Sequence, residues 1–145
     1  MLICLEVSAG LLLILYSIYF FKILKGDPLD FEIELMKSLA EWMINRGPAS
    51  RWQLWMLYFL SILLEAGYFF LVFSLMNNMF IRMFSMFFAG FEVFHLFLVG
   101  ANLNRFFRGK IPLKHIFSWP VERCSAVLFF TNTMLVLVNV FFYPL

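Results

Sequence analysis

Charged side chains are scarce in this sequence of 145 residues, because Asp, Glu, Lys and Arg together make up only 14% of it. Soluble domains are about a quarter charged and about half apolar. This chain is instead 63% hydrophobic and 21% aromatic, with 21 phenylalanines. A soluble domain of this length cannot bury so many large apolar side chains, which excludes a soluble enzyme. Disorder is excluded too, because disordered segments are rich in charge and poor in aromatic residues.

Cysteine and net charge are also low, and each shortage excludes a class of protein. Two cysteines, Cys4 and Cys124, are too few for a disulfide framework or a thiolate metal cluster. A net charge of +2 is too small to indicate nucleic acid as a partner. The sequence also lacks a glycine-rich phosphate loop and a nucleophile motif, so an enzyme is not expected. An integral membrane protein remains.

Four stretches are long and apolar enough to cross a bilayer, which needs about 20 mostly apolar residues. They cover about 2–24, 52–76, 79–103 and 119–143. Between the first two, the segment 28–46 starts at a proline, stops before Gly47 and mixes charged with apolar residues at helical spacing, as an interfacial helix does. We predict an all-α integral membrane protein with a single transmembrane domain, 1–145. It is a four-transmembrane-helix bundle with an additional amphipathic helix on the cytoplasmic side.

The distribution of lysine and arginine predicts the orientation. Ten of these residues flank or occupy the first and third connections, and only Arg82 lies beside the second. Basic residues stay on the cytoplasmic side of a membrane. Loops 1 and 3 are therefore expected in the cytoplasm, and both termini outside, in an inner or plasma membrane.

Each predicted span carries small or polar residues on one helical face. Such residues mark the faces by which helices touch in lipid, so the pattern predicts a bundle with a polar interior. The four stripes are Glu6, Gly10, Leu13 and Ser17; Tyr58, Ser61, Glu65, Tyr68 and Val72; Ser85, Ala89, Glu92, His95, Val99 and Asn102; and Ser118, Ser125, Asn132 and Asn139.

Two carboxylates are predicted to meet at mid-membrane depth. Glu65 and Glu92 are each 13.5 residues from the middle of the second turn (78.5 − 65 and 92 − 78.5). At 1.5 Å per helical residue, both lie about 20 Å from that turn. His95 is less than one turn further in. Asn132 is 13 residues from the inner end of its span (132 − 119) and is expected near the same level. Nearer the outer face, an access layer is expected from Glu6, Arg82 and Asn139.

Two glycines are level with each other in the same way. Gly67 and Gly90 are each 11.5 residues from the turn (78.5 − 67 and 90 − 78.5). Glycine lets two transmembrane helices approach closely. The second and third spans are therefore expected to touch at this level.

Ionisable residues inside a membrane usually mark an ion pathway. If Glu65 and Glu92 face each other in a low dielectric, they cannot both stay ionised, so they hold a proton or share a cation. We therefore expect ion or proton movement, by the chain alone as an oligomer or as a subunit of a membrane complex. Glu65 and Glu92 would bind the ion or proton, His95 would relay or gate it, and Asn132 would hydrogen-bond.

Two alternatives stay open. The same network suits a non-catalytic accessory subunit of a membrane complex, in which it merely locks the helices together. Glu92 and His95 also form an E-x-x-H step, to which Glu65 adds a carboxylate, so these three are candidate metal ligands. These residues provide only half of the ligands of a di-iron site. A haem bound by His95 would need a second axial ligand, and the spans offer no obvious one, because His115 lies in a loop. The cofactor stays undetermined. The expected partners are the lipid bilayer and either other membrane subunits or further copies of the chain, with no nucleic acid.

Overall fold

A computed structural model describes residues 1–143 and contains helices and their connections, with no strand within that range. Four of the helices are long and apolar enough to cross a membrane. This confirms the predicted all-helical class with four candidate spans. Residues 144–145 of the predicted domain lie outside the described part. The elements are α1 (Leu2–Leu24), α2 (Pro28–Arg46), α3 (Ala49–Leu75), α4 (Met79–Phe107), the short 3₁₀ turn η1 (Leu113–His115) and α5 (Trp119–Phe142).

Two helices are longer than the spans expected from hydropathy. α3 starts three residues before position 52, and α4 runs four residues past position 103. Hydropathy reports where the apolar stretch ends, whereas a helix ends where the backbone must turn. For α4 that point comes near Gly109, which has a positive φ of 70° and precedes Pro112. The start of α4 is set by Asn78, whose side chain accepts hydrogen bonds from the backbone N–H groups of Phe80 and Ile81.

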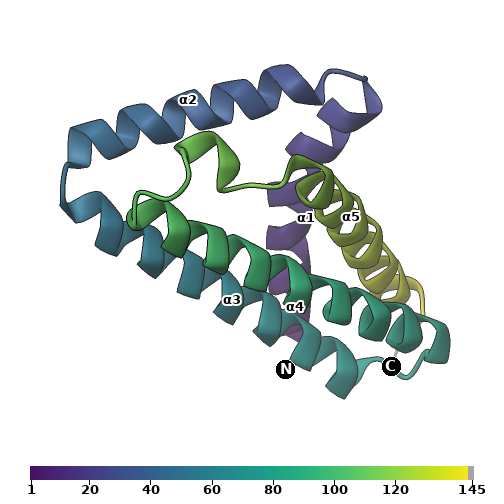
Figure 1. Ribbon diagram of the computed structural model, residues 1–145. Coiled ribbons are helices and arrows are strands. Elements are labelled where there is room, and N and C mark those ends of the chain that lie inside the picture. The colour runs from purple at the N-terminus through teal and green to yellow at the C-terminus, as the bar shows by residue number, and fades with distance from the viewer. Residues whose placement is uncertain (144–145) are drawn as a thin grey trace.

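The helices form a bundle with two different ends (Figure 1). α3 and α4 run side by side as an antiparallel hairpin, while α1 packs mainly against α5 and also contacts α3. α2 and the connection between α4 and α5 lie at one end, which we call the α2 end. The N-terminus and the α3–α4 turn lie at the other end, which we call the turn end.

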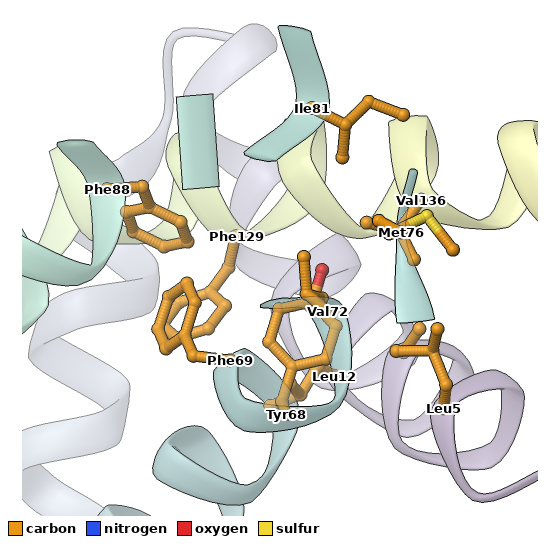
Figure 2. Close-up of a cluster of buried hydrophobic side chains, with 11 residues drawn as sticks. Leu5, Leu12, Tyr68, Phe69, Val72, Met76, Ile81, Phe88, Phe129 and Val136 are labelled. Atoms are coloured by element: carbon orange, nitrogen blue, oxygen red, sulfur yellow. The ribbon is translucent and has the colours of Figure 1, made fainter. Parts of the chain in front are cut away.

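The apolar core occupies the half of the bundle nearer the turn end. Aromatic rings hold its centre together: Phe88 lies edge-on to Phe129 at a centroid distance of 4.7 Å and to Phe69 at 5.2 Å. Figure 2 shows the side chains of this core, which come from α1, α3, α4 and α5. Buried members of the core are Leu5, Ala9, Leu12, Tyr68, Phe69, Val72, Met76, Ile81, Phe88, Phe129 and Val136.

The stripe predicted for the first span is wrong by one residue. The buried residues of α1 are Leu5, Ala9 and Leu12, not Gly10 or Leu13. One residue is about 100° around a helix, so the predicted stripe lies to one side of the true contact face. The serines of α1 need no interhelical partner, since Ser17 donates its hydroxyl to the carbonyl of Ile14 within the same helix.

The close approach expected at Gly67 and Gly90 is also wrong. A Cβ atom added to either glycine would meet nothing within 4 Å. The tight contact is at Gly100, where an added Cβ would clash with the Tyr58 hydroxyl. That hydroxyl donates to the backbone carbonyl of Leu96 at 2.7 Å. The contact between α3 and α4 that requires a glycine is therefore at Gly100, nearer the α2 end.

α2 is attached to the bundle through a buried carboxylate. Glu32 is 1% exposed, and it is the only buried residue of α2, whereas Leu35 is exposed. Arg123 of α5 donates two hydrogen bonds to it, Nε to Oε1 at 2.6 Å and Nη2 to Oε2 at 2.9 Å. Tyr19 of α1 donates its hydroxyl to Oε1. A single carboxylate thus joins three helices at the α2 end.

Candidate functional site

The predicted stripes of the third and fourth spans face each other as an antiparallel ladder of polar contacts. Asn132 Nδ2 donates to Ser85 Oγ at 2.8 Å, and Ser125 Oγ donates to Glu92 Oε1 at 2.7 Å. His95 Nε2 contacts Glu122 Oε1 at 2.9 Å. From one contact to the next, the residue number rises by seven and then by three on α4, and it falls by the same amounts on α5. Regular helix pairing therefore brings all three polar contacts into register.

His95 bridges two carboxylates within this ladder. Its Nδ1 lies 2.8 Å from Glu92 Oε2, and its Nε2 contacts Glu122 on the neighbouring helix. Glu92 is 2% exposed and His95 is 6% exposed. We call Glu92, His95 and Glu122 the carboxylate–histidine triad. It is the most enclosed group of ionisable side chains in the described part of the chain.

The geometry of the triad sets its proton count. Each nitrogen–oxygen contact requires one proton between the two atoms, so the triad holds two protons. The histidine is then an imidazolium between two carboxylates, or a neutral imidazole beside one neutral carboxylic acid and one carboxylate. The net charge is −1 in both arrangements (−1 + 1 − 1, or 0 + 0 − 1). Ser125 donates to Glu92, which supports a negative charge there.

Glu65 lies beside the triad but is not hydrogen-bonded to it. Its Oε1 accepts from the Tyr16 hydroxyl of α1 at 3.4 Å. Its Oε2 is buried and has no hydrogen-bond partner within the described residues. Glu65 and Glu92 line the same cavity of about 230 Å³ between α3 and α4. The structure therefore brings the two predicted carboxylates to one cavity, with Glu65 the less satisfied of the two.

Asn132 belongs to a separate polar layer, so its predicted level is wrong. It accepts a hydrogen bond from the Tyr68 hydroxyl and donates to Ser85, and all three residues are fully buried. Ser85 is seven residues, or two helical turns, closer to the turn end than Glu92. The expectation placed Asn132 by counting from the start of its span. The contact register of α4 and α5, which that count did not contain, sets its true depth.

The three residues of the expected outer layer share the turn end without forming a joined group. Glu6 is half-buried, Arg82 is exposed and Asn139 is 8% exposed. Within residues 1–143, no ion pair or side-chain hydrogen bond connects them. Arg82 lines a separate groove with Asn77 and three methionines. An access role for these residues stays a prediction.

The residues suggested as metal ligands are arranged differently from a metal site. Both ring nitrogens of His95 point at carboxylates on opposite sides, rather than converging with them on one point. Among the described residues, no group of three or more His, Cys, Asp or Glu side chains is placed to hold a metal ion. The E-x-x-H step of Glu92 and His95 is instead used for an internal hydrogen bond.

Two side chains of the candidate site were not predicted from the sequence. Glu122 continues the stripe of the fourth span, four residues after Ser118 and three before Ser125. Tyr16 was missed because the stripe of the first span was displaced. It follows Leu12 by four residues, on the true contact face of α1.

Comparison of the chain with models of known protein families, with curated proteins and with solved structures found no match.

Proposed function

We propose that the chain is a multi-pass membrane protein that moves protons across a bilayer by means of Glu65 and the carboxylate–histidine triad. The observation that carries the proposal is the double contact of His95, which lies between Glu92 and Glu122 and contacts one with each ring nitrogen. An imidazole held in this way can accept a proton on one side and release one on the other. Ionisable residues in a transmembrane interior are typical of such relays.

The charge of the cluster supports proton binding. The triad carries a net charge of −1, and an ionised Glu65 beside the same cavity would make the net charge of the four residues −2. Within the described residues no lysine or arginine pairs with these carboxylates, since Arg123 is engaged by Glu32. A net charge of this size is unfavourable in a low-dielectric interior unless a proton or cation neutralises it. Glu65 is the group on which we place that proton.

The layout of the bundle supports a direction of entry. The side chain of Glu122 keeps 18% exposure and lies on the first turn of α5, toward the α2 end. From it, polar contacts run inward through His95 to Glu92. Beyond the layer of Asn132, the buried side chains toward the turn end are mostly apolar, with Asn139 as a polar exception. We therefore assign proton entry from the α2 end, and release at the turn end after a rearrangement of the apolar core.

The distribution of charge extends the proposal to topology. The helices that can span a membrane are joined at the α2 end by the two basic connections. By the positive-inside rule, this end is cytoplasmic and both termini are outside, in an inner or plasma membrane. α2 would lie at the cytoplasmic interface. The bilayer is the immediate partner, with further copies of the chain or other membrane subunits beside it.

The proposal is tested by proton flux into liposomes that contain the purified protein and a pH-sensitive dye. A valinomycin-induced potassium potential, negative inside, drives protons inward. We expect wild-type vesicles to acidify faster than protein-free vesicles, and Glu65→Gln or Glu92→Gln to reduce the rate to the protein-free value. Both replacements keep the side-chain size but remove the exchangeable carboxyl proton.

Glu41→Gln is the matched control, because Glu41 is exposed on α2 and should leave the flux unchanged. Circular dichroism of each variant verifies that the helices are retained. Wild-type vesicles that acidify no faster than protein-free vesicles would overturn the proposal. So would full flux in the Glu65 and Glu92 variants.

A further inference from the structure

The cavity between α3 and α4 has the features of a ligand site. Its walls are mostly apolar, and its polar side chains are the two nearly buried carboxylates Glu65 and Glu92. Two wall residues, Ala66 and Val93, are exposed on the outside of the helix pair. The cavity therefore extends from the carboxylates to the surface that faces lipid in the proposed topology. The lining residues are Ile62, Glu65, Ala66, Phe69, Ala89, Glu92, Val93 and Leu96.

Of the four carboxylate oxygens that Glu65 and Glu92 bring to the cavity, one has no hydrogen-bond partner among the described residues. Both oxygens of Glu92 are used, Oε1 by Ser125 and Oε2 by His95. Glu65 Oε1 accepts from Tyr16, which leaves Oε2 of the same carboxylate buried and unpaired. A buried acceptor without a donor is costly, and it marks a place where an additional donor would be stabilising.

A water molecule or a metal ion suits this place poorly. A water molecule could donate to Glu65 Oε2, but it would leave the charge of the carboxylate uncompensated in this mostly apolar site. Calcium and magnesium ions take about six or more oxygen ligands. An organic ammonium ion matches better, because its N–H groups can donate to the Glu65 carboxylate and its charge compensates that carboxylate, while its apolar body contacts the walls. Phe69 also provides an aromatic ring in the wall, and cations are attracted to such rings.

We propose that this cavity binds a small lipophilic amine in its ammonium form, which enters from the lipid between α3 and α4 and donates a hydrogen bond to the Glu65 carboxylate after a rotation of that side chain turns Oε2 toward the cavity. The positive charge compensates the carboxylate, and the volume of about 230 Å³ limits the ligand to less than drug size. The inference rests on the proposed function, since a bound ammonium would occupy the carboxylate on which that function places the proton.

The test is equilibrium dialysis of the purified protein in detergent with 2-phenylethylammonium, and with 2-phenylethanol as an uncharged ligand of the same shape. We expect the ammonium to bind about tenfold more tightly than the alcohol, equivalent to about 1.4 kcal/mol. Glu65→Gln should abolish this preference, and Glu41→Gln should retain it. Ala89→Leu, which fills the cavity, should weaken both ligands, whereas Ala101→Leu outside the lining should not.

Equal binding of the two ligands would overturn the inference, as would an ammonium preference that survives Glu65→Gln. If Glu65→Gln fails to fold, unchanged binding in Ala89→Leu would overturn it instead. The assay contains no membrane gradient, so its result is separate from the flux measurement. Flux without ammonium binding would contradict only this inference, and ammonium binding without flux would contradict only the proposed function.

Discussion

Replacing His95 with alanine should lower the free energy of unfolding by about 3–5 kcal/mol, the cost of removing one member of a buried ion pair. In this variant the buried carboxylate of Glu92 loses the donor to its Oε2, and Glu122 loses its partner on α4. Ser125 remains as a donor to Glu92 Oε1 but cannot replace the lost contact at Oε2. The effect should be large because Glu92 is only 2% exposed and has little access to water.

The sequence contains two histidines, and the second provides the control. His115 is exposed in η1, so His115→Ala should change the stability by no more than about 0.5 kcal/mol. Unfolding in detergent micelles titrated with dodecyl sulfate measures both variants. Equal stability of His95→Ala and His115→Ala would show that the triad does not hold α4 to α5.

Replacing Arg123 with alanine should cost about 2 kcal/mol, within the range for hydrogen bonds to a charged group. The change removes two hydrogen bonds to Glu32 and leaves this buried carboxylate with Tyr19 as its donor. The expected loss is smaller than at His95 because the Arg123 side chain keeps 37% exposure and is partly screened by solvent. Arg46→Ala, an exposed arginine at the end of α2, should have little effect in the same unfolding assay.

The pH dependence of stability gives a second measurement of the same contact. Burial raises the pKa of the Glu32 carboxyl, but the hydrogen bonds from Arg123 and Tyr19 and the charge of Arg123 outweigh burial and lower the pKa below its usual 4.5. A carboxyl group whose pKa is lowered in the folded state stabilises the fold at pH values above its ordinary pKa. That contribution is lost as the pH falls through the lowered pKa. Wild type should thus lose stability on acidification relative to Glu32→Gln. Parallel pH profiles of the two proteins would contradict this assignment.

The helices could be predicted from the sequence because their signals are local. Apolar length indicated the four spans, and proline and glycine marked the limits of α2. The rotation of α1 could not be predicted in the same way, because apolar residues cover most of its circumference. Its three buried residues, Leu5, Ala9 and Leu12, are no more apolar than many exposed ones.

The candidate site was partly predictable for a related reason. Polar residues in an apolar helix are few, so Glu65, Glu92 and His95 stand out and do face the interior. Their partners depend on how far one helix slides along another, which is a property of the packed bundle. Counting from the start of its span placed Asn132 at the level of Glu92, whereas it lies two helical turns nearer the turn end. The same count gave no reason to pair His95 with Glu122. The contacts Ser85–Asn132 and Glu92–Ser125 supply that register.

A double-mutant cycle between His95→Ala and Glu122→Gln tests most directly whether ionisable side chains of different helices meet inside this bundle. The free energies of unfolding of wild type, both single variants and the double variant give the coupling between the two side chains. We expect a coupling of at least about 1.5 kcal/mol, as measured for close charged pairs, and a coupling near zero when Glu41→Gln replaces Glu122→Gln. Additive effects of His95→Ala and Glu122→Gln would contradict the contact, and with it the relay that depends on it.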